Sequence, residues 1–528
     1  MKKIIYILLL LTLVIPTSCE KMPNEVVDDF NLGINSDFLE YTLVVEFIDA
    51  ANPQNPPQDI ELQILDNENN GLLDSEGEVE FSVDAGIASF ILNPNSKPNG
   101  PEDVKSFNLY AEAPGFLPVN FQVDFTENSK DQNLTISMVN TETPPSGVGS
   151  SIENLNLSNG TLNNSATIEI PVSDEKITGA AIKLEPGTIF YDANGNQIFG
   201  ESLNINFTHF DASGDASLSA FPGGFTPESV IGENGEEENI YFVTAGFASI
   251  DMDIDGINVK EFSKPIKVTM EVDSNGFNLD TDADIKIGDQ IPVWSYEVES
   301  GTWVYEKTGT VVSNNAKMEV SFETDHLTWY NLDFYSYTCY RSNAITVNAP
   351  GSSMGSYFYT ELVYAYNNQP VGYYARKRMY LYDGAQINYL RVPNNIPMKV
   401  RIFNGSNWYN KGNLITETEP FIICTESTTI NLPSSAFPQL VSAEVTIECP
   451  YSNFKFKPSY WFYYREKGAR WWNYGYMHSG KFQTYRMKTA TTYEFRTYFG
   501  GWVTTEYTLT NNENFIDIIS DEICNFAL

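Results

Sequence analysis

The chain has 528 residues, with 31 Lys and Arg against 69 Asp and Glu and a formal net charge of −38. This balance excludes a typical nucleic-acid-binding protein, because phosphate recognition requires a basic surface that releases counterions. His209, His326 and His478 are far apart in sequence, so they do not form a zinc-binding motif. With 42% hydrophobic residues, the chain can bury the cores of several domains.

Residues 1–18 have the features of a secretory signal peptide. Two lysines precede an apolar run of 12 residues from Ile4 to Ile15, and Pro-Thr-Ser then leads to Cys19. Twelve helical residues span about 18 Å, which is too short for a bilayer core of about 30 Å. The small residues before Cys19 resemble the lipobox of bacterial lipoproteins, which implies that Cys19 is acylated and attaches the protein to the membrane. The alternative is an ordinary signal peptide with an incidental cysteine.

A polar tether over residues 19–37 precedes a series of short β-rich runs over residues 38–143. Runs such as YTLVVEFID, DIELQILD and FQVDFT are separated by Pro, Gly and Asn clusters, as expected for strands joined by turns. About seven such strands predict a β-sandwich. The segment FNLYAEAPGFLPVNFQVDFT resembles the transthyretin-like folds of carboxypeptidase regulatory domains, in which a Pro-Gly-aromatic turn joins two core strands.

Residues 144–339 contain turn and strand motifs in a distinctive order. They are a Pro-Gly turn at 186–187, an Asn-Gly hairpin at 194–195, an Ala-Phe-Pro-Gly block at 220–223 and a His-Leu-x-Trp-x-Asn strand at 326–331. This order resembles the extracellular module of the astroprincin family and of cartilage intermediate layer proteins. The resemblance implies an extracellular β-sandwich that is used for contacts and not for catalysis.

Two acidic segments of this region are candidates for calcium binding. Residues 251–256 (DMDIDG) begin like a calcium loop, but Phe262 occupies the position of the closing Glu. The alternation of Asp with apolar residues favours a strand that enters a hairpin. A looser cluster of Asp280, Asp282 and Asp284 is the remaining calcium candidate, and no other cofactor is expected. We do not expect an enzyme.

Charge and aromatic content both change near residue 340. Residues 1–339 contain 14 Lys, no Arg and 55 Asp and Glu, whereas residues 340–528 contain 17 Lys and Arg and 14 Asp and Glu. Such a step predicts a domain boundary. Residues 344–353 align with 444–453, and residues 397–414 align with 491–509. This similarity predicts two tandem β modules over residues 340–440 and 441–528, and a duplicated module favours binding through avidity.

Four cysteines follow Cys19, and they all flank or lie within these two modules. An even number of cysteines in an oxidising compartment predicts two disulfides, with three possible connectivities. Containment within each module favours the pairs Cys339–Cys424 and Cys449–Cys524, with free buried thiols as the alternative. Zinc ligation is not indicated, because no C-x-x-C motif occurs.

The last module has the highest density of aromatic and cationic residues. Successive residues of a strand face opposite sides, so Trp461 and Tyr463 share one face, whereas Phe462 and Tyr464 share the other. An exposed aromatic face with polar neighbours would suit sugar rings or protein partners, and the alternative is that all the rings are core. The candidate ligand-binding residues are Trp461, Tyr463, Arg465, Arg470, Trp471, Trp472 and Tyr474.

The sequence therefore predicts an all-β protein, a multidomain string of β-sandwich modules behind a lipoprotein signal peptide. The leading functional hypothesis is a non-catalytic, lipid-anchored outer-membrane protein that is displayed at the cell surface and acts in adhesion or in glycan or protein binding. The alternative is a structural or assembly accessory of an outer-membrane complex. The expected partners are the membrane, through the N-terminal lipid, and a glycan or another envelope protein.

Overall fold

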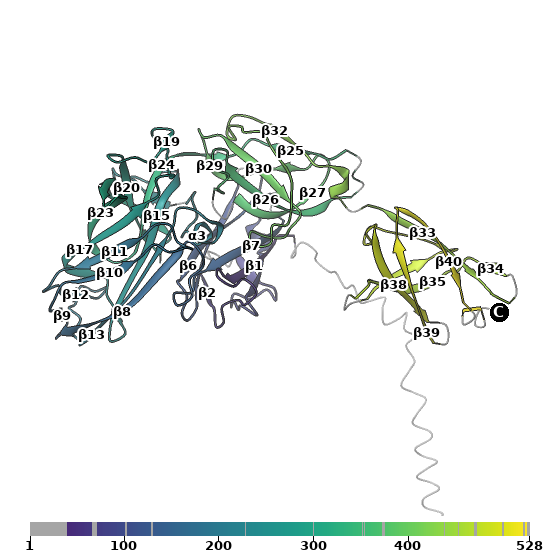
Figure 1. Cartoon of the computed structure of the whole chain (residues 1–528), viewed down its shortest axis with the longest axis horizontal. Helices are drawn as coiled ribbons and strands as arrows, with labels where there is room; N and C mark the ends of the chain where they lie inside the picture. The colour runs from purple at the N-terminus through teal and green to yellow at the C-terminus, as the bar shows by residue number, and fades with distance from the viewer. Residues whose placement is uncertain are drawn as a thin grey trace, which may run out of the picture.

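The computed structural model describes residues 40–524, except 66–70, 101–102, 128–129, 228, 299, 351, 353, 372–374, 438, 452–453, 469–471, 499–500 and 521–522. The predicted signal peptide, Cys19 and the tether lie outside the described residues. Strands dominate the described part of the chain and form a series of sheets, with one short α-helix and two 3-10 turns (Figure 1). The predicted all-β, multidomain architecture is confirmed.

The first unit is a two-sheet sandwich. Its sheets have the strand orders β3-β4-β1-β7 and β2-β5-β6. Buried and partly exposed residues alternate along the first strand (TLVVEFID), because period-two patterning turns one side of a strand toward the core. The elements are β1 (Thr42–Asp49), β2 (Glu61–Ile64), β3 (Leu72–Asp74), β4 (Ile87–Leu92), η3 (Pro94–Ser96), β5 (Lys105–Glu112), β6 (Val119–Phe125) and β7 (Asp131–Met138).

The second unit is larger and has two main sheets. One has the order β14-β21-β20-β24-β15-β13-β8-β9, and the other has the order β10-β11-β17-β23-β22. The elements are β8 (Val148–Ser158), β9 (Thr161–Leu162), β10 (Ala166–Ile170), β11 (Ala180–Leu184), β12 (Phe190–Tyr191), β13 (Ser202–Phe210), α3 (Asp215–Ser219), β14 (Ser229–Ile231), β15 (Ile240–Ile254), β16 (Ile257–Asn258), β17 (Glu261–Val272), β18 (Phe277–Asn278), β19 (Ala283–Asp284), β20 (Gln290–Glu297), β21 (Thr302–Thr310), β22 (Val312–Asn314), β23 (Lys317–His326) and β24 (Trp329–Arg341).

Residues 251–256 form a hairpin, as their alternation predicts. Ile254 pairs with Ile257 across the turn from β15 to β16. Asp255 and Gly256 have φ values of 50° and 84°, which a tight hairpin turn requires at its two central positions. The Asp253 carboxylate accepts hydrogen bonds from the Gly256 amide and the Asn204 side chain, so it stabilises the turn.

The third and fourth units have matching strand orders. The third has sheets β28-β25-β32 and β27-β26-β30-β31, and the fourth, which we call the terminal module, has sheets β34-β33-β37 with β40 and β36-β35-β38-β39. The elements are β25 (Ile345–Asn348), β26 (Ser356–Tyr364), β27 (Arg376–Leu381), β28 (Gln386–Ile387), β29 (Leu390–Pro393), β30 (Met398–Phe403), β31 (Leu414–Glu417), β32 (Thr428–Asn431), η5 (Ser434–Ala436), β33 (Val441–Glu448), β34 (Lys455–Phe456), β35 (Tyr460–Glu466), β36 (Asn473–Met477), β37 (Lys481–Thr484), β38 (Thr491–Tyr498), β39 (Trp502–Leu509) and β40 (Glu513–Ile519).

Three of the units share one pairing scheme around their first strand. In each unit the first strand pairs in parallel with the last one, as β1 does with β7, β25 with β32 and β33 with β40. On its other side, each first strand pairs in an antiparallel manner, with β4, β28 and β37 respectively. The duplication predicted for residues 340–528 therefore extends, at the level of topology, to the first unit.

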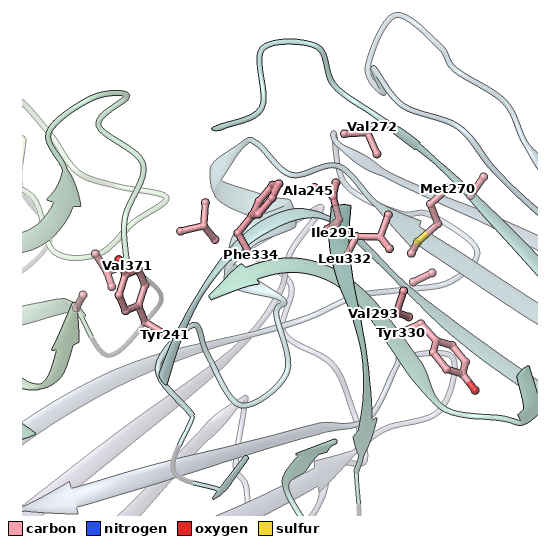
Figure 2. Close-up of a cluster of buried hydrophobic side chains, with 14 of the residues drawn as sticks. Tyr241, Ala245, Met270, Val272, Ile291, Val293, Tyr330, Leu332, Phe334 and Val371 are labelled. Atoms are coloured by element: carbon pink, nitrogen blue, oxygen red, sulfur yellow. The ribbon is translucent and has the colours of Figure 1, made fainter. Parts of the chain in front are cut away.

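The first three units share buried surfaces. Figure 2 shows Tyr241 and Phe334 of the second unit in the same apolar cluster as Val371 of the third. Another cluster joins Leu117 and Val139 of the first unit to the core of the second. By contrast, the buried clusters of the terminal module contain only residues after 440, and Figure 1 shows this module set apart from the others. We call the first three units together the body.

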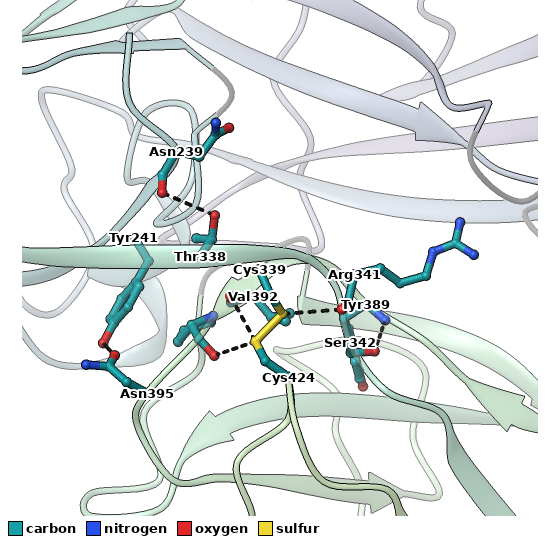
Figure 3. The surroundings of a disulfide bond; sticks show 11 residues. Asn239, Tyr241, Thr338, Cys339, Arg341, Ser342, Tyr389, Val392, Asn395 and Cys424 are labelled. Carbon is teal, nitrogen blue, oxygen red and sulfur yellow. Dashed lines mark hydrogen bonds between the residues drawn. A yellow bond between two sulfur atoms is a disulfide. The ribbon is translucent and has the colours of Figure 1, made fainter. Parts of the chain in front are cut away.

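Strand β24 continues across the composition step near residue 340. Its last residues pair with β29 of the third unit, with Cys339 opposite Val392 and Arg341 opposite Leu390. The Cys339–Cys424 disulfide lies beside this pairing (Figure 3). A second disulfide joins Cys449 to Cys524 in the terminal module. Both pairs are those that containment within a module predicts.

Candidate binding face of the terminal module

The sheet β36-β35-β38-β39 has one buried and one open side. Phe462 and Tyr464 are 4% and 3% exposed and belong to the core of the terminal module. Trp461 is 60% exposed, and Tyr463 beside it also faces solvent. The prediction that these residues alternate between two faces of one strand is therefore confirmed. We define the aromatic face as the open side, which carries Trp461, Tyr463, Arg465, Trp472, Tyr474, Tyr476, Arg496, Tyr498 and Trp502.

The pairing of β35 with β36 brings the first group of rings together. Trp461 is paired with Tyr476, and Tyr463 is paired with Tyr474, on neighbouring strands. The Trp461 ring centroid lies 5.2 Å from that of Tyr476 and 5.9 Å from that of Tyr474, which is 67% exposed. Cross-strand aromatic pairs at such spacing stabilise a sheet, and here they also leave flat ring surfaces open to solvent.

Arg496 lies at the centre of the aromatic face. Its guanidinium carbon is 4.1 Å from the ring centroid of Trp472, 4.6 Å from that of Trp502 and 5.5 Å from that of Tyr463. Among the described residues, no carboxylate forms an ion pair with it, and its Nε has no hydrogen-bond partner. The rings therefore hold a cation whose charge is free for an external acceptor.

Arg465 has a different environment on the same face. It stacks over Trp472 at 4.4 Å, and its Nε also donates to the Glu494 carboxylate on β38. Lys467, at the end of the strand, pairs with Glu506 at 2.7 Å. Arg465 and Lys467 are thus neutralised by carboxylates of neighbouring strands, whereas Arg496 is not.

Trp502 and Tyr498 complete the far side of the aromatic face. They are paired across β38 and β39, with ring centroids 5.5 Å apart. Trp502 also contacts Tyr463 edge-on at 5.7 Å. The face therefore runs across all four strands, from Tyr476 and Tyr474 through Trp461 and Tyr463 to Trp502 and Tyr498.

The structure brings together five of the seven predicted ligand-binding residues. Trp461, Tyr463, Arg465, Trp472 and Tyr474 all lie on the aromatic face, whereas Arg470 and Trp471 lie outside the described residues. Arg496, Tyr498 and Trp502 were not among the predicted residues, because they belong to strands far along the chain. For Arg496 and Tyr498, alternation along β38 was the available signal, because it places both on one side of the strand.

The acidic segment near residue 280 does not gather into a metal site. Asp284 is exposed on β19, and Asp280 and Asp282 lie in the turn that precedes it. In the described part of the chain, no group of three or more His, Cys, Asp or Glu side chains is placed to hold a metal ion. Calcium binding by Asp280, Asp282 and Asp284 stays a prediction.

A buried polar cluster lies elsewhere, in the second unit. Lys176 Nζ is 2.9 Å from Asp211 Oδ1 and 2.7 Å from His209 Nδ1. Burial, followed by the nearby Lys176 charge, holds the pKa of His209 well below its usual value, and burial also lowers the pKa of Lys176. All three side chains are enclosed by the core, so this cluster contributes to the fold and is closed to a ligand.

Comparisons with known proteins add little to this description. No protein-family model matches the chain, and no curated protein matches it. A streptococcal ancillary pilin is similar over 45% of this chain and 93% of its own length, at 9% identity and a TM-score of 0.18. The minor pilin GBS52 of Streptococcus agalactiae covers 34% of this chain and 95% of its own, at 10% identity and a TM-score of 0.18.

The major pilin subunit BcpA of Bacillus cereus aligns over 91% of this chain and 99% of its own, at 8% identity and a TM-score of 0.14. These TM-scores are too low to indicate a shared fold or function. Within the described residues, no helix is long and apolar enough to cross a bilayer.

Proposed function

We propose that this protein is a non-catalytic, lipid-anchored outer-membrane protein that binds glycans at the cell surface through the aromatic face of its terminal module. One observation carries the proposal: seven aromatic side chains around two arginines lie on one open side of a sheet whose other side forms the core. Exposed Trp and Tyr rings offer flat apolar surfaces, and the adjacent guanidinium and phenol groups offer hydrogen bonds. Sugar rings, with apolar C–H faces and polar edges, match both properties.

The location of the aromatic face supports this role. Among the described residues, the terminal module shares no buried cluster with the body, and the rings of its open sheet face solvent. Acylation at Cys19 would place the body next to the membrane, with the terminal module at the other end of the chain. The resemblance of residues 144–339 to extracellular contact modules agrees with a role for the body as a spacer.

A glycan array followed by tryptophan fluorescence titration tests the proposal. A bound sugar should quench Trp461 and Trp502, and the double variant Trp461→Ala/Trp502→Ala should lose most of the affinity, because each stacking contact is worth about 0.5–1.5 kcal/mol beyond its buried area. Phe515→Ala is the matched control, since Phe515 is a 74% exposed ring on the other sheet of the same module. Absence of any glycan binding, together with co-purification of an envelope complex, would instead support the structural accessory role.

A further inference from the structure

A cavity lies between the first and third units, away from the aromatic face. It consists of two adjacent hollows of about 190 and 360 Å³. Both are lined by Asn133 and Leu134 on the first unit and by Arg376 and Lys377 on β27 of the third. The larger hollow is within the usual size range of small-molecule sites, about 300–1,000 Å³, and such sites occur preferentially at domain interfaces. We call the two hollows together the interface cavity.

Two polar bridges join the walls of the interface cavity. Arg391 of β29 pairs with Asp124 of β6 at 2.5 Å, with both side chains largely buried. The Tyr409 hydroxyl, in the β30–β31 loop, donates to Glu46 of β1 at 2.9 Å. These contacts hold the two units at a fixed separation, so the space between them is a defined feature of the body.

The lining of the interface cavity is positively charged. It contains five cationic side chains and only two carboxylates, Asp124 and Glu46, each of which takes part in one of the bridges just described. The cations are Arg341, Arg376, Lys377, Arg378 and Arg391. This excess is notable because residues 1–339, which contribute one wall, contain 55 acidic residues against 14 lysines. An anion entering the cavity would meet a locally favourable field.

Lys377 lines both hollows of the interface cavity, where its ammonium group could bind an anionic ligand. Its Nζ lies 3.2 Å from the Asn388 carbonyl oxygen and 4.8 Å from the ring centroid of Tyr389. No carboxylate of the described residues forms an ion pair with it, and burial lowers its pKa to about 8. Lys377 is half-buried, and a partly desolvated ammonium without a carboxylate partner is costly, so a bound anion would reduce that cost.

Two further donors at the interface cavity make no hydrogen bond within the described residues. Arg376 is 6% exposed, and its terminal nitrogen pairs with Asp215 at 2.7 Å, whereas its Nε makes no hydrogen bond and lies 3.9 Å from the Glu361 carboxylate. The indole Nε1 of Trp408 is buried and likewise has no acceptor among the described residues. Leaving a buried donor unsatisfied costs about 1–3 kcal/mol, so these groups are suited to acceptors supplied by a ligand.

We infer that the interface cavity binds a small carboxylated sugar. The carboxylate would pair with the Lys377 ammonium, and hydroxyl oxygens would accept from Arg376 and from Trp408. The lining also supplies amide groups from Asn133 and Asn388 and ring surfaces from Tyr359 and Tyr389. A simple inorganic anion would use the charges alone, whereas a sugar acid also uses the amides and rings. This site is independent of the aromatic face.

Isothermal titration calorimetry on the mature chain tests the inference, with D-galacturonate and N-acetylneuraminate as probes and D-galactose and inorganic phosphate as comparisons. We expect at least one sugar acid to bind, and galactose and phosphate to bind at least tenfold more weakly. Lys377→Met should weaken sugar-acid binding at least tenfold. Trp408→Phe, which keeps a ring and removes the N–H, should weaken it severalfold. Lys467→Met, at an exposed lysine of the terminal module, should change nothing.

Circular dichroism of each variant separates lost binding from lost folding. The Trp461→Ala/Trp502→Ala variant should bind the sugar acids as the wild type does, because its substitutions are confined to the terminal module. The inference is overturned if neither sugar acid binds, if Lys377→Met binds them unchanged, or if phosphate binds as tightly as they do. Loss of binding in the tryptophan double variant, with Lys377→Met unaffected, would assign the sugar acids to the aromatic face instead.

Discussion

The third unit and the terminal module have the same strand order. They differ in the outward face of one sheet, which is largely covered in the third unit and open to solvent in the terminal module. In the third unit, the outward side of β26 is covered beyond its first residues: Tyr357 is 44% exposed, whereas Tyr359 and Glu361 are 2% and 1% exposed. In the terminal module, the outward side of β35 carries exposed rings. A duplicated sandwich can therefore use the same sheet either to join neighbouring units or to remain open, and the side chains alone decide which.

Charge pairing explains how the covered face is closed. Glu361 accepts from Lys411 at 2.9 Å and lies near Arg376, and both cations also pair with Asp215 of α3 in the second unit. On the aromatic face, the corresponding sheet pairs its charges locally, as Arg465 does with Glu494. Charged side chains of the third unit thus form ion pairs with Asp215 of the second unit, whereas Arg465 of the terminal module forms its ion pair within its own sheet.

The largest expected effect on stability comes from breaking the ion pairs that Glu361 forms with Arg376 and Lys411. Glu361→Gln leaves Arg376 and Lys411 with Asp215 as their remaining carboxylate partner, and breaking a buried ion pair in this way costs about 3–5 kcal/mol. The free energy of unfolding of the body, measured by urea denaturation, should fall by that amount. Glu506→Gln, at the exposed pair with Lys467, should cost far less, because solvent screens an exposed ion pair. Equal effects of the two changes would contradict the contrast between the faces.

The second effect concerns the disulfide of the terminal module. Replacing Cys449 and Cys524 with Ala removes a bridge that closes a loop of 75 residues, which costs about 2–5 kcal/mol of the free energy of unfolding. Because the module shares no buried cluster with the body, it should unfold at a lower denaturant concentration while the transition of the body stays in place. A single transition that shifts as a whole would show that the module is coupled to the body.

The third effect is a pH dependence confined to the body. The folded state holds His209 neutral because its pKa is lowered by burial, whereas the unfolded chain takes up a proton near the usual value of about 6.5. The stability that this group contributes is complete above about pH 6.5 and is lost as the pH falls. His209→Gln should flatten the dependence of body stability on pH between about 6.5 and 5, by at most about 1.4 kcal/mol per pH unit.

The unfolding transition of the terminal module is the control for this experiment. His478, in the terminal module, is exposed. The transition of the terminal module should therefore respond identically to pH in the wild type and in His209→Gln. An unchanged slope for the body transition in His209→Gln would show that His209 does not stay neutral in the folded state.

The smallest expected effect on stability comes from removing arginines that stack on aromatic rings, Arg496 in the terminal module and Arg378 in the third unit. Arg496→Gln removes contacts with three rings, and Arg378→Gln removes one, over Tyr357 at 4.7 Å. An exposed cation–π contact is worth about 0.5–1 kcal/mol, so the first change should lower the stability of its module more than the second. Differential scanning calorimetry measures both. A larger loss for Arg378→Gln would contradict the central position of Arg496.

Much of the fold could be predicted from the sequence because the signals were local. Alternation marked the two faces of 460–464, the Asp-Gly pair at 255–256 predicted a hairpin, and the sequence repeat predicted matching modules. The cysteine pairs followed from the same repeat. Each of these features depends on residues that are close in sequence or that recur at a fixed interval.

Features that depend on packing between distant segments could not be predicted. Arg496 reaches Trp472 only because β38 pairs with β35 while β36 flanks the other side. The interface cavity needs β1, β6 and β7 opposite β27 and β29, which are more than 200 residues away in sequence. No periodicity or composition encodes which face of one sandwich will lie against another.

Strand β24 also determines how the molecule would respond to a mechanical load. A pull applied to the chain between residue 40 and residue 440 would pass through this strand, which belongs to the sheets of two units at once. Its antiparallel pairing with β15 extends from the pair Ile240 and Tyr337 to the pair Ser249 and Trp329, so a displacement of the strand along its own length would break many hydrogen bonds together. The Cys339–Cys424 bridge beside β29 then gives the load a covalent path from the end of β24 to residue 424, next to β32. The junction of the second and third units is thus held both by strand pairing and by a covalent bond.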